Sequence, residues 1–328
     1  MHVMRSHMLL LPVITLCSFF SLAFWFFIAN NNVTPRPSLK IPQKRPDTSK
    51  PCKGCRDSAL IAKALESYSN GWTKQEANFK SFRSLLNSKC HAVSKAVVTQ
   101  NNTPVGSSVL YDGEKRKPLQ VTQALFSILA KEQPFGNATW ESCAVVGNGG
   151  ILVNSSCGEE INSAQFVIRY SGLMERRRPF VESLRPYGQA LLLLPAFSYG
   201  HNTPVSLRAF YTLEDFGSDR PLPVFLNPEY LRRLTKFWRE QGLKSVRLST
   251  GIIMASLALE ICTNVHLYGF WPFNKHPHDN QLITNHYYDN RESKKNVHSM
   301  PTEFEHLLKL HKQGVVRIHL GECQPTHS

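Results

Sequence analysis

CAVVGNGGILVNSSCG, from Cys143 to Gly158, and RLSTGIIMASLALEICTNVHLYGFWPF, from Arg247 to Phe273, decide the fold of this chain. The first begins with a short apolar run, Ala144 to Val146, which predicts a buried strand that ends in a glycine turn. Glycine at such a turn lets the backbone approach a ligand closely. The second places Ser249-Thr250-Gly251 directly before an apolar helical run, which leads into a further strand, Val265 to Phe270.

A Ser or Thr at a helix start caps free N–H groups, and those groups together with the helix dipole also favour a phosphate. Strands and helices alternate around the two stretches, with strands expected at Phe166–Arg169, Ala190–Leu194 and Val315–Leu320 and helices at Glu229–Gln241 and Pro301–Gln313. This alternation predicts an α/β fold, a three-layer sandwich with a mainly parallel sheet and a ligand crevice at the carboxyl ends of its strands. Spacing alone therefore indicates an anionic-ligand site and nothing more specific.

The N-terminal part predicts a membrane anchor. Residues 8–28 carry no charge and are long enough to cross a bilayer as one helix, after a short tail of residues 1–7. A cleaved signal peptide is the alternative, although Trp25 to Ile28 does not resemble a small-residue cleavage site. Residues 29–56 are rich in Pro, Asn, Ser and Lys and predict a stem, so residues 57–328 form the expected folded domain, which begins with a helical segment from Ser58 to Val98.

The orientation of the anchor follows from what lies after it. Only Arg5 precedes the span, whereas several Lys and Arg residues follow it, which argues weakly against a cytoplasmic N-terminus. Nearly the whole chain lies after the span, however, and carries N-glycosylation sequons at Asn32, Asn101, Asn137 and Asn154. We therefore expect a single-pass type II membrane protein whose folded domain, residues 57–328, faces the lumen.

Cysteine content and charge agree with that compartment. Cys17 lies within the expected span, and seven further cysteines remain for an oxidising lumen. Zinc binding through Cys52 and Cys55 is an alternative, but no second pair follows at finger spacing. The formal net charge of +14 suits acidic partners. We expect no nucleic-acid partner, because the chain is expected to be lumenal and contains no recognisable nucleic-acid-binding module.

Four segments resemble one enzyme family. The two opening stretches resemble the large and small sialyl motifs of the animal sialyltransferases, and HYYD (His286 to Asp289) and His298-x4-Glu303 resemble the third and very small motifs. The four occur in the order of that family, and CAVVGNGGIL, YGFWPF and HYYDN resemble its α-2,8 branch. The resemblance implies a single Rossmann-like domain of the GT-A-like type that works without a metal ion. It also implies that the protein is anchored in the Golgi membrane. It also implies transfer of sialic acid from CMP-sialic acid, with inversion, to a sialylated glycoprotein or glycolipid.

The same resemblance assigns the site residues. The reaction needs a base for the acceptor hydroxyl, stabilisation of the departing CMP phosphate and a nucleotide pocket. His298 corresponds to the family's catalytic base, Glu303 to its acidic partner and His286 to a contact of the donor phosphate. The remaining residues form the implied nucleotide pocket, without a metal or other cofactor: Asn148, Ser249, Thr250, Gly251, Phe270 and Trp271. A plain core position is the alternative for Trp271, as is loop packing for Tyr287, Tyr288 and Asp289.

The resemblance further implies two disulfides, Cys143–Cys262 and Cys157–Cys323. An odd number of lumenal cysteines then remains (Cys52, Cys55 and Cys90), so at least one of them is free or intermolecular. Pairing with another copy or with other glycosyltransferases is a further expectation for such a protein.

One part of the large motif is missing. After Arg169 the family continues with a loop and a strand that ends in a Pro-Ser turn, whereas here Tyr170-Ser171-Gly172 runs straight into the segment beyond that strand. Altered splicing, an error in gene prediction and a shortened enzyme all remain open as causes. Loss of an interior strand exposes apolar neighbours and backbone donors. We therefore predict little or no transferase activity for the chain as written, with a non-enzymatic Golgi partner protein as the alternative function.

Overall fold

The computed structural model describes residues 53–136, 140–158, 161, 166–168, 177–217, 220–245, 247–290 and 298–323. They belong to a compact unit that runs from Cys52 to Ser328. The predicted tail, membrane span and nearly all of the stem lie outside the described residues. None of the helices in the described part of the chain is both long enough and apolar enough to cross a membrane.

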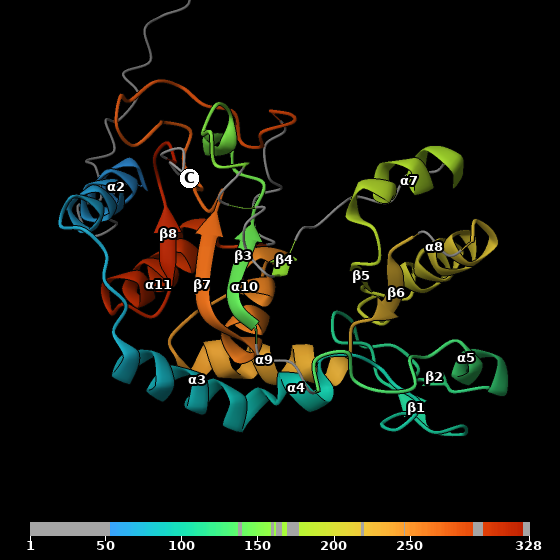
Figure 1. Cartoon of the computed structure of the whole chain (residues 1–328). Helices are drawn as coiled ribbons and strands as arrows, with labels where there is room; N and C mark the ends of the chain where they lie inside the picture. Colours follow the sequence, from blue (N-terminus) through green and yellow to red (C-terminus); the bar gives the residue numbers. More distant parts are fainter. Residues whose placement is uncertain are drawn as a thin grey trace, which may run out of the picture. The chain divides into compact units, whose positions relative to one another are not determined.

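Four parallel strands form the main sheet, in the order β4-β3-β7-β8 (Figure 1). They are β3 Trp140–Val146, β4 Phe166–Ile168, β7 Cys262–Tyr268 and β8 Arg317–His319. Strand β3 buries three consecutive side chains, Cys143 to Val145, as strands covered on both faces do. Val146 is paired with Tyr268, so β3 and β7 end side by side.

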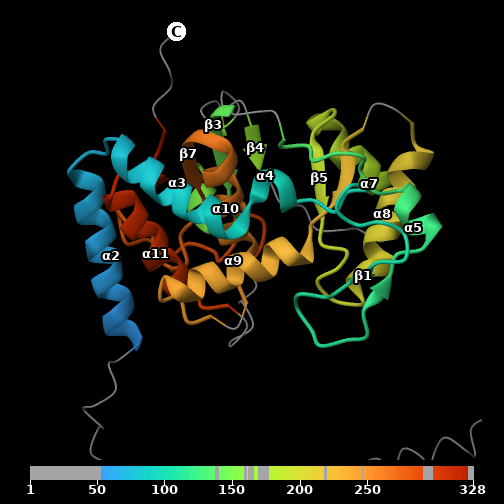
Figure 2. The same cartoon turned by 90° about the horizontal axis from the view of Figure 1, so that it is seen from below.

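Helix α10 (Thr250–Ile261) packs against β3 and β7. It also contacts α9 (Pro228–Glu240) and α3 (Glu76–Cys90), two helices that can be located in Figure 2. Because neighbours surround it, its side chains are buried on nearly all sides. The hydroxyl oxygen of Ser249 accepts the N–H of Ile252 at 3.3 Å, which confirms the predicted N-cap.

Two further groups of helices complete this half of the fold. Helix α11 (Met300–Lys312) packs against β8 and has Pro301 in its first turn. Helices α2 (Lys53–Ser69), α3 and the short α4 (Ala92–Lys95) account for most of the helical segment expected from Ser58 to Val98. Helix α2 packs against α11.

A second parallel sheet consists of β5 (Leu191–Leu194) and β6 (Leu222–Phe225). These strands share a separate apolar core with α7 (Arg177–Leu184) and α8 (Asn202–Asp215). The remaining elements are short: β1 Ser108–Val109, β2 Leu119–Gln120, α5 Gln123–Ser127 and the 3₁₀ turns η1 Gly150–Leu152 and η2 Arg185–Tyr187.

The α/β class with parallel strands is confirmed, but the described residues contain two parallel sheets instead of one. No backbone pairing joins β5 or β6 to the main sheet within the described residues, and β4 is an edge strand of that sheet. Strand β4 directly precedes Arg169, where the expected block is absent. Strand β6 was not predicted, because its four residues contain Pro223, which is unusual inside a sheet.

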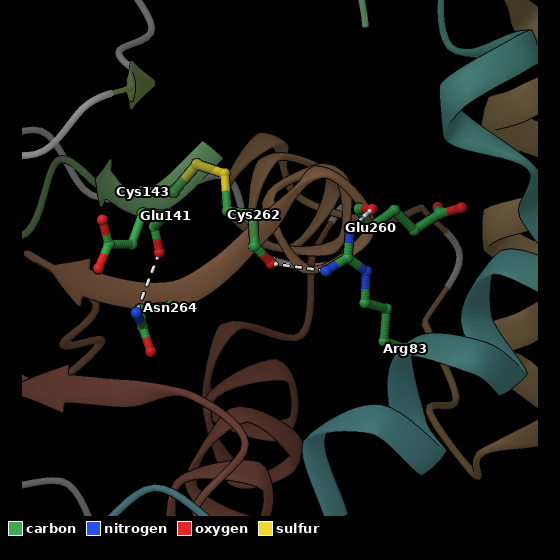
Figure 3. The surroundings of a disulfide bond; sticks show 6 residues. All are labelled: Arg83, Glu141, Cys143, Glu260, Cys262 and Asn264. Atoms are coloured by element: carbon green, nitrogen blue, oxygen red, sulfur yellow. Dashed lines mark hydrogen bonds between the residues drawn. A yellow bond between two sulfur atoms is a disulfide. The ribbon is translucent and has the colours of Figure 1, made fainter. Parts of the chain in front are cut away.

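Both predicted disulfides are present. Cys143–Cys262 joins β3 to the first residue of β7, with the Cα atoms 5.9 Å apart (Figure 3). Cys157–Cys323 closes a loop of sequence separation 166 between the region after η1 and the region after β8. Of the three other cysteines that follow the expected span, Cys90 is free and buried, which agrees with the expectation that at least one of them is unpaired, whereas Cys52 and the side chain of Cys55 lie outside the described residues.

Candidate functional site

Two glycine-containing turns lie against each other where β3 and β7 end. The N–H of Gly147 donates to the carbonyl of Tyr268 at 2.7 Å, and the N–H of Gly149 donates to the carbonyl of Gly269 at 3.0 Å. A Cβ atom added at Gly149 would lie 2.5 Å from the Gly269 oxygen, closer than real Cβ contacts allow. Only glycine permits this approach, so the GNGG sequence is explained by contact between two turns at the carboxyl edge of the sheet.

The segment that contains His286 covers the first of these turns. Gly149 forms an isolated antiparallel bridge with His286, and the N–H of Tyr287 donates to the carbonyl of Asn148 at 3.0 Å. The structure therefore brings together Asn148 and His286, two predicted site residues that are far apart in the sequence. No hydrogen bond from the Asn148 side chain to another described residue is present, which leaves its amide available to a ligand.

The His286 imidazole is held by an aspartate. Its Nδ1 lies 2.6 Å from Oδ1 of Asp289, and its backbone N–H donates to the Asp289 carbonyl at 3.1 Å. A carboxylate accepts only, so Nδ1 carries the proton that is donated. The His286 ring also stacks on Tyr288, with the ring centroids 5.2 Å apart. Tyr287 and Tyr288 are exposed, so this loop presents aromatic side chains beside the glycine turn.

Ser249 serves two structural roles at the start of α10. Besides capping Ile252, its hydroxyl hydrogen-bonds a carboxylate oxygen of Glu303, and its backbone N–H donates to Oε1 of Glu303 at 2.9 Å. The Ser249 hydroxyl is therefore engaged in hydrogen bonds inside the protein. Thr250, by contrast, is exposed, and Gly251 is partly exposed at the first turn of the helix. Glu303 is 3% exposed, and this burial raises its pKa, while the Ser249 bonds and the nearby His298 lower it.

His298 lies directly before α11 and is exposed. Its Nδ1 is 3.1 Å from the backbone carbonyl of Arg247. A carbonyl can only accept, so the hydrogen bond requires the proton on Nδ1 and leaves the lone pair on Nε2. This is the tautomer that a general base needs. Glu303, expected to assist His298, makes its hydrogen bonds to Ser249, and its link to His298 is the lowering of its own pKa by that nearby residue.

Phe270 lies between the glycine turn and the start of α10. A Cβ atom added at Gly147 would lie 3.4 Å from its ring, and one added at Gly251 would lie 3.0 Å from it. Trp271 is 4% exposed, its indole N–H donates to the Lys275 carbonyl at 2.7 Å, and its ring packs on Phe273 and Phe304. The structure thus places Trp271 at a core position, which was the alternative interpretation of this residue from the sequence.

The other predicted sites are described only in part. Asn101 and Asn154 are exposed, as glycosylation requires, and Asn32 and Asn137 lie outside the described residues. Where the structure describes the chain, it contains no cluster of three or more His, Cys, Asp or Glu side chains arranged to hold a metal ion.

Sequence reasoning missed the contacts that organise the start of α10. The Ser249–Glu303 pair spans 54 positions, and only the capping serine and an acidic residue in a helical first turn hinted at it. Arg247 was quoted only as the first residue of the small-motif stretch, yet its carbonyl positions His298 and its guanidinium lies over the ring of Tyr199.

Comparison with known proteins identifies the family of this arrangement. The model of glycosyltransferase family 29 (sialyltransferase) matches residues 97–177 and 170–315, in two parts that meet where the large motif is shortened. The chain is 39% identical to mouse alpha-2,8-sialyltransferase 8F over 284 residues, 77% of this chain and 71% of that protein. It is also 39% identical to the Xenopus tropicalis alpha-N-acetylneuraminide alpha-2,8-sialyltransferase over 285 residues, 77% of this chain and 82% of that one.

A crystal structure of a mammalian sialyltransferase aligns with 81% of this chain and 95% of its own, at a TM-score of 0.44 and 19% identity, a similarity too low to support an argument about the fold. The sequence matches cover more than half of the chain and more than two thirds of the relatives. The chain therefore belongs to glycosyltransferase family 29, the sialyltransferases.

Proposed function

We propose that this protein transfers sialic acid from CMP-sialic acid to a hydroxyl of an already sialylated glycan, in α-2,8 linkage and with inversion at the anomeric carbon. The observation that carries the proposal is the similarity, at 39% identity over most of the chain, to proteins named alpha-2,8-sialyltransferases. Acceptors are sialylated glycoproteins or glycolipids.

His298 is the proposed general base. Nε2 takes the proton of the acceptor hydroxyl as the oxygen attacks the anomeric carbon, and the bond between that carbon and the phosphate oxygen breaks to release CMP. The hydrogen bond from Nδ1 to the Arg247 carbonyl supports this role because it keeps the Nε2 lone pair free. Glu303 stabilises the imidazolium that forms, since its charge attracts His298.

The nucleotide lies at the carboxyl ends of β3 and β7 in this proposal. Asn148, Thr250 and Gly251 contact CMP, together with the backbone at Ser249, and His286 stabilises the leaving phosphate. Phe270 and, behind it, Trp271 form the wall of the pocket. The free N–H groups at the start of α10 add to the stabilisation of negative charge there. The proposed reaction uses no metal ion or other cofactor.

The proposed location is the Golgi membrane. Residues 8–28 act as a signal-anchor after a cytoplasmic tail of residues 1–7, and the stem of residues 29–56 holds the catalytic domain, residues 57–328, in the lumen. Two disulfides and exposed sequons support a lumenal catalytic domain. Dimerisation with itself or with other glycosyltransferases remains part of the proposal.

One observation favours a second function. The family match is divided at residues 170–177, and the described strands form two separate parallel sheets. A protein that lacks one wall of its nucleotide pocket would act, if at all, as a non-enzymatic partner of other Golgi glycosyltransferases.

Binding and turnover distinguish the two functions. CMP binding is measured by calorimetry, and transfer is measured from CMP-sialic acid to α-2,3-sialyllactose and to a sialylated glycoprotein, for the chain as it stands and for a version that carries a relative's missing block after Arg169. The proposal expects CMP binding and a product cleaved only by a sialidase that accepts α-2,8 linkages. Absence of CMP binding and of transfer in both versions would contradict it.

A further inference from the structure

Arg247 has a partly buried guanidinium that no described residue neutralises. The guanidinium carbon lies 4.5 Å from the centroid of the Tyr199 ring, a cation–π contact. Neither a hydrogen bond nor a salt bridge joins the guanidinium to any residue that the structure describes. Five N–H donors without an acceptor are unusual for a side chain that is partly removed from water, and they suit an incoming anion.

The aromatic platform beneath this guanidinium is rigid. A Cβ atom added at Gly113 would lie 2.5 Å from the Tyr199 ring, so the ring packs directly on the Gly113 backbone. The N–H of Gly113 donates to the carbonyl of Ser198 at 2.9 Å, which joins the two segments beside the ring. His201 stacks on Tyr199 with the ring centroids 5.4 Å apart. The guanidinium therefore rests on a fixed surface and loses little freedom when it binds.

Asp112 is an acidic residue whose pKa is influenced by Arg247, but it does not satisfy the guanidinium. Burial raises the pKa of Asp112, whereas a hydrogen bond from Ser198 and the attraction of Arg247 and Arg232 lower it. No ion pair forms between Asp112 and Arg247 among the described residues. Asp112 therefore attracts the Arg247 guanidinium electrostatically but accepts none of its N–H hydrogen bonds.

The backbone of the same residue holds the proposed base. The Arg247 carbonyl accepts from Nδ1 of His298 at 3.1 Å and from the Ser245 hydroxyl at 2.6 Å. The residue that carries this cation is thus also the residue whose carbonyl positions the His298 imidazole. Of the groups proposed for the donor, His286 lies in a different segment, against Gly149, whereas Ser249, Thr250 and Gly251 follow Arg247 closely in the sequence.

We propose that the Arg247 guanidinium binds the carboxylate of the acceptor's terminal sialic acid. This inference rests on the proposed function. In α-2,8 transfer the sugar that supplies the reacting hydroxyl is itself a carboxylate anion, so a cation beside the base selects sialylated acceptors over neutral ones. A planar guanidinium forms two parallel hydrogen bonds with a carboxylate, which fixes the orientation of the sugar as well as its charge.

The experiment measures binding of three probes to the full-length chain by calorimetry: CMP, α-2,3-sialyllactose and lactose. Four forms are compared, namely wild type, Arg247→Gln, Arg247→Lys and the control Lys244→Gln. Lys244 is an exposed cation three positions earlier, without a hydrogen-bonded partner among the described residues. Thermal unfolding of each form verifies that the variants fold.

Wild type is expected to bind sialyllactose more tightly than lactose. Arg247→Gln should lose at least about tenfold in sialyllactose affinity and keep its CMP affinity, because a charged hydrogen-bonded pair is lost only at the acceptor. Arg247→Lys should retain part of the preference for sialyllactose over lactose, and Lys244→Gln should retain all of this preference.

The outcomes separate this inference from the proposed function. Absence of CMP binding both in wild type and in the version that carries the restored block would contradict the proposed function itself. Normal CMP binding with equal affinity for sialyllactose and lactose, or an unchanged sialyllactose affinity in Arg247→Gln, would overturn the inference alone. A weakened CMP affinity in Arg247→Gln with unchanged sialyllactose binding would place the guanidinium on the donor and also overturn it.

Discussion

Glu303, in the first turn of α11, accepts a hydrogen bond of 2.9 Å from the backbone N–H of Ser249, the N-cap of α10. The Ser249 hydroxyl donates to the same carboxylate. Two residues separated by 54 positions thereby join the start of the helix proposed to bind the nucleotide to the start of the helix that follows His298. Any shift of one helix relative to the other would break a buried, charge-assisted pair of hydrogen bonds.

Glu303→Ala should lower the free energy of unfolding by about 1–3 kcal/mol, because it leaves the buried Ser249 N–H without an acceptor. Glu303→Gln should retain most of the stability, since its amide oxygen can still accept. Urea unfolding monitors both variants. Glu305→Gln is the matched control, since that neighbouring carboxylate is 48% exposed in its salt bridge with Arg56, and its loss should cost at most about 1 kcal/mol. Equal costs for Glu303→Ala and the control would contradict the role assigned to Glu303.

Glu260 should make stability depend on pH. Its side chain is 2% exposed and accepts from the N–H of Ala92 at 2.8 Å and the hydroxyl of Tyr230 at 3.2 Å. Burial raises its pKa from 4.5 to about 7, against these hydrogen bonds and the charge of Arg83, which lower it. Figure 3 shows Arg83, which donates to the Glu260 and Cys262 carbonyls at 2.8 and 3.3 Å.

The folded chain retains the Glu260 proton over a pH range in which the unfolded chain has released it. The contribution of this group to stability is therefore fully present below pH 4.5 and is lost as the pH rises to about 7, by at most about 1.4 kcal/mol per pH unit. Urea unfolding between about pH 4.5 and 8 should show this slope in wild type and in Glu305→Gln, and a smaller slope in Glu260→Gln. Identical slopes in wild type and Glu260→Gln would show that Glu260 does not cause the pH dependence of stability.

His298→Ala should abolish transfer while CMP binding is retained, because the proposed base acts on the acceptor and not on the nucleotide. Positioned acid–base catalysis is worth about 10²–10⁴-fold. Turnover is measured with CMP-sialic acid and sialyllactose in the version that carries the restored block. His278→Ala, an exposed histidine outside the proposed site, is the control and should retain activity. Wild-type turnover in His298→Ala would refute the assignment.

Loss of the His286 side chain should also lower turnover, through weaker stabilisation of the leaving phosphate. Asp289→Asn tests the support of that ring, because an amide can accept from Nδ1 but carries no charge to stabilise an imidazolium. We expect Asp289→Asn to reduce turnover less than His286→Ala does, because the ring and its hydrogen bond are retained. A turnover in Asp289→Asn equal to that of wild type would show that the carboxylate does not act through His286.

Short-range sequence patterns predicted the helices and strands around the site, but they did not predict the contacts between segments that are distant in the sequence. Ser249 before an apolar run predicted the cap of α10, because capping depends on residues three positions apart. The resemblance to a family supplied the Cys143–Cys262 and Cys157–Cys323 pairs, which spacing could not. The hydrogen bonds of Glu303 to Ser249 and of His298 to the Arg247 carbonyl arise only from folding, since they span 54 and 51 positions.

The final prediction concerns the division of the sheet. Within the described residues β4 is an edge strand, and the β5–β6 pair is not joined to it by backbone hydrogen bonds. The family match breaks at residues 170–177, immediately after β4. A relative's strand and loop inserted there should pair with β4 and complete the nucleotide pocket near Asn148.

The restored chain should therefore unfold at a higher temperature, bind CMP at least about tenfold more tightly for each charge-assisted hydrogen bond regained, and transfer sialic acid much faster than the chain as written. Thermal unfolding, calorimetry with CMP and transfer to sialyllactose measure these effects in parallel. A block of the same length composed of Gly and Ser is the control, because it restores length without a strand. If the chain as written matches the restored one in CMP affinity and turnover, the shortened motif is a working variant and the two sheets suffice for catalysis.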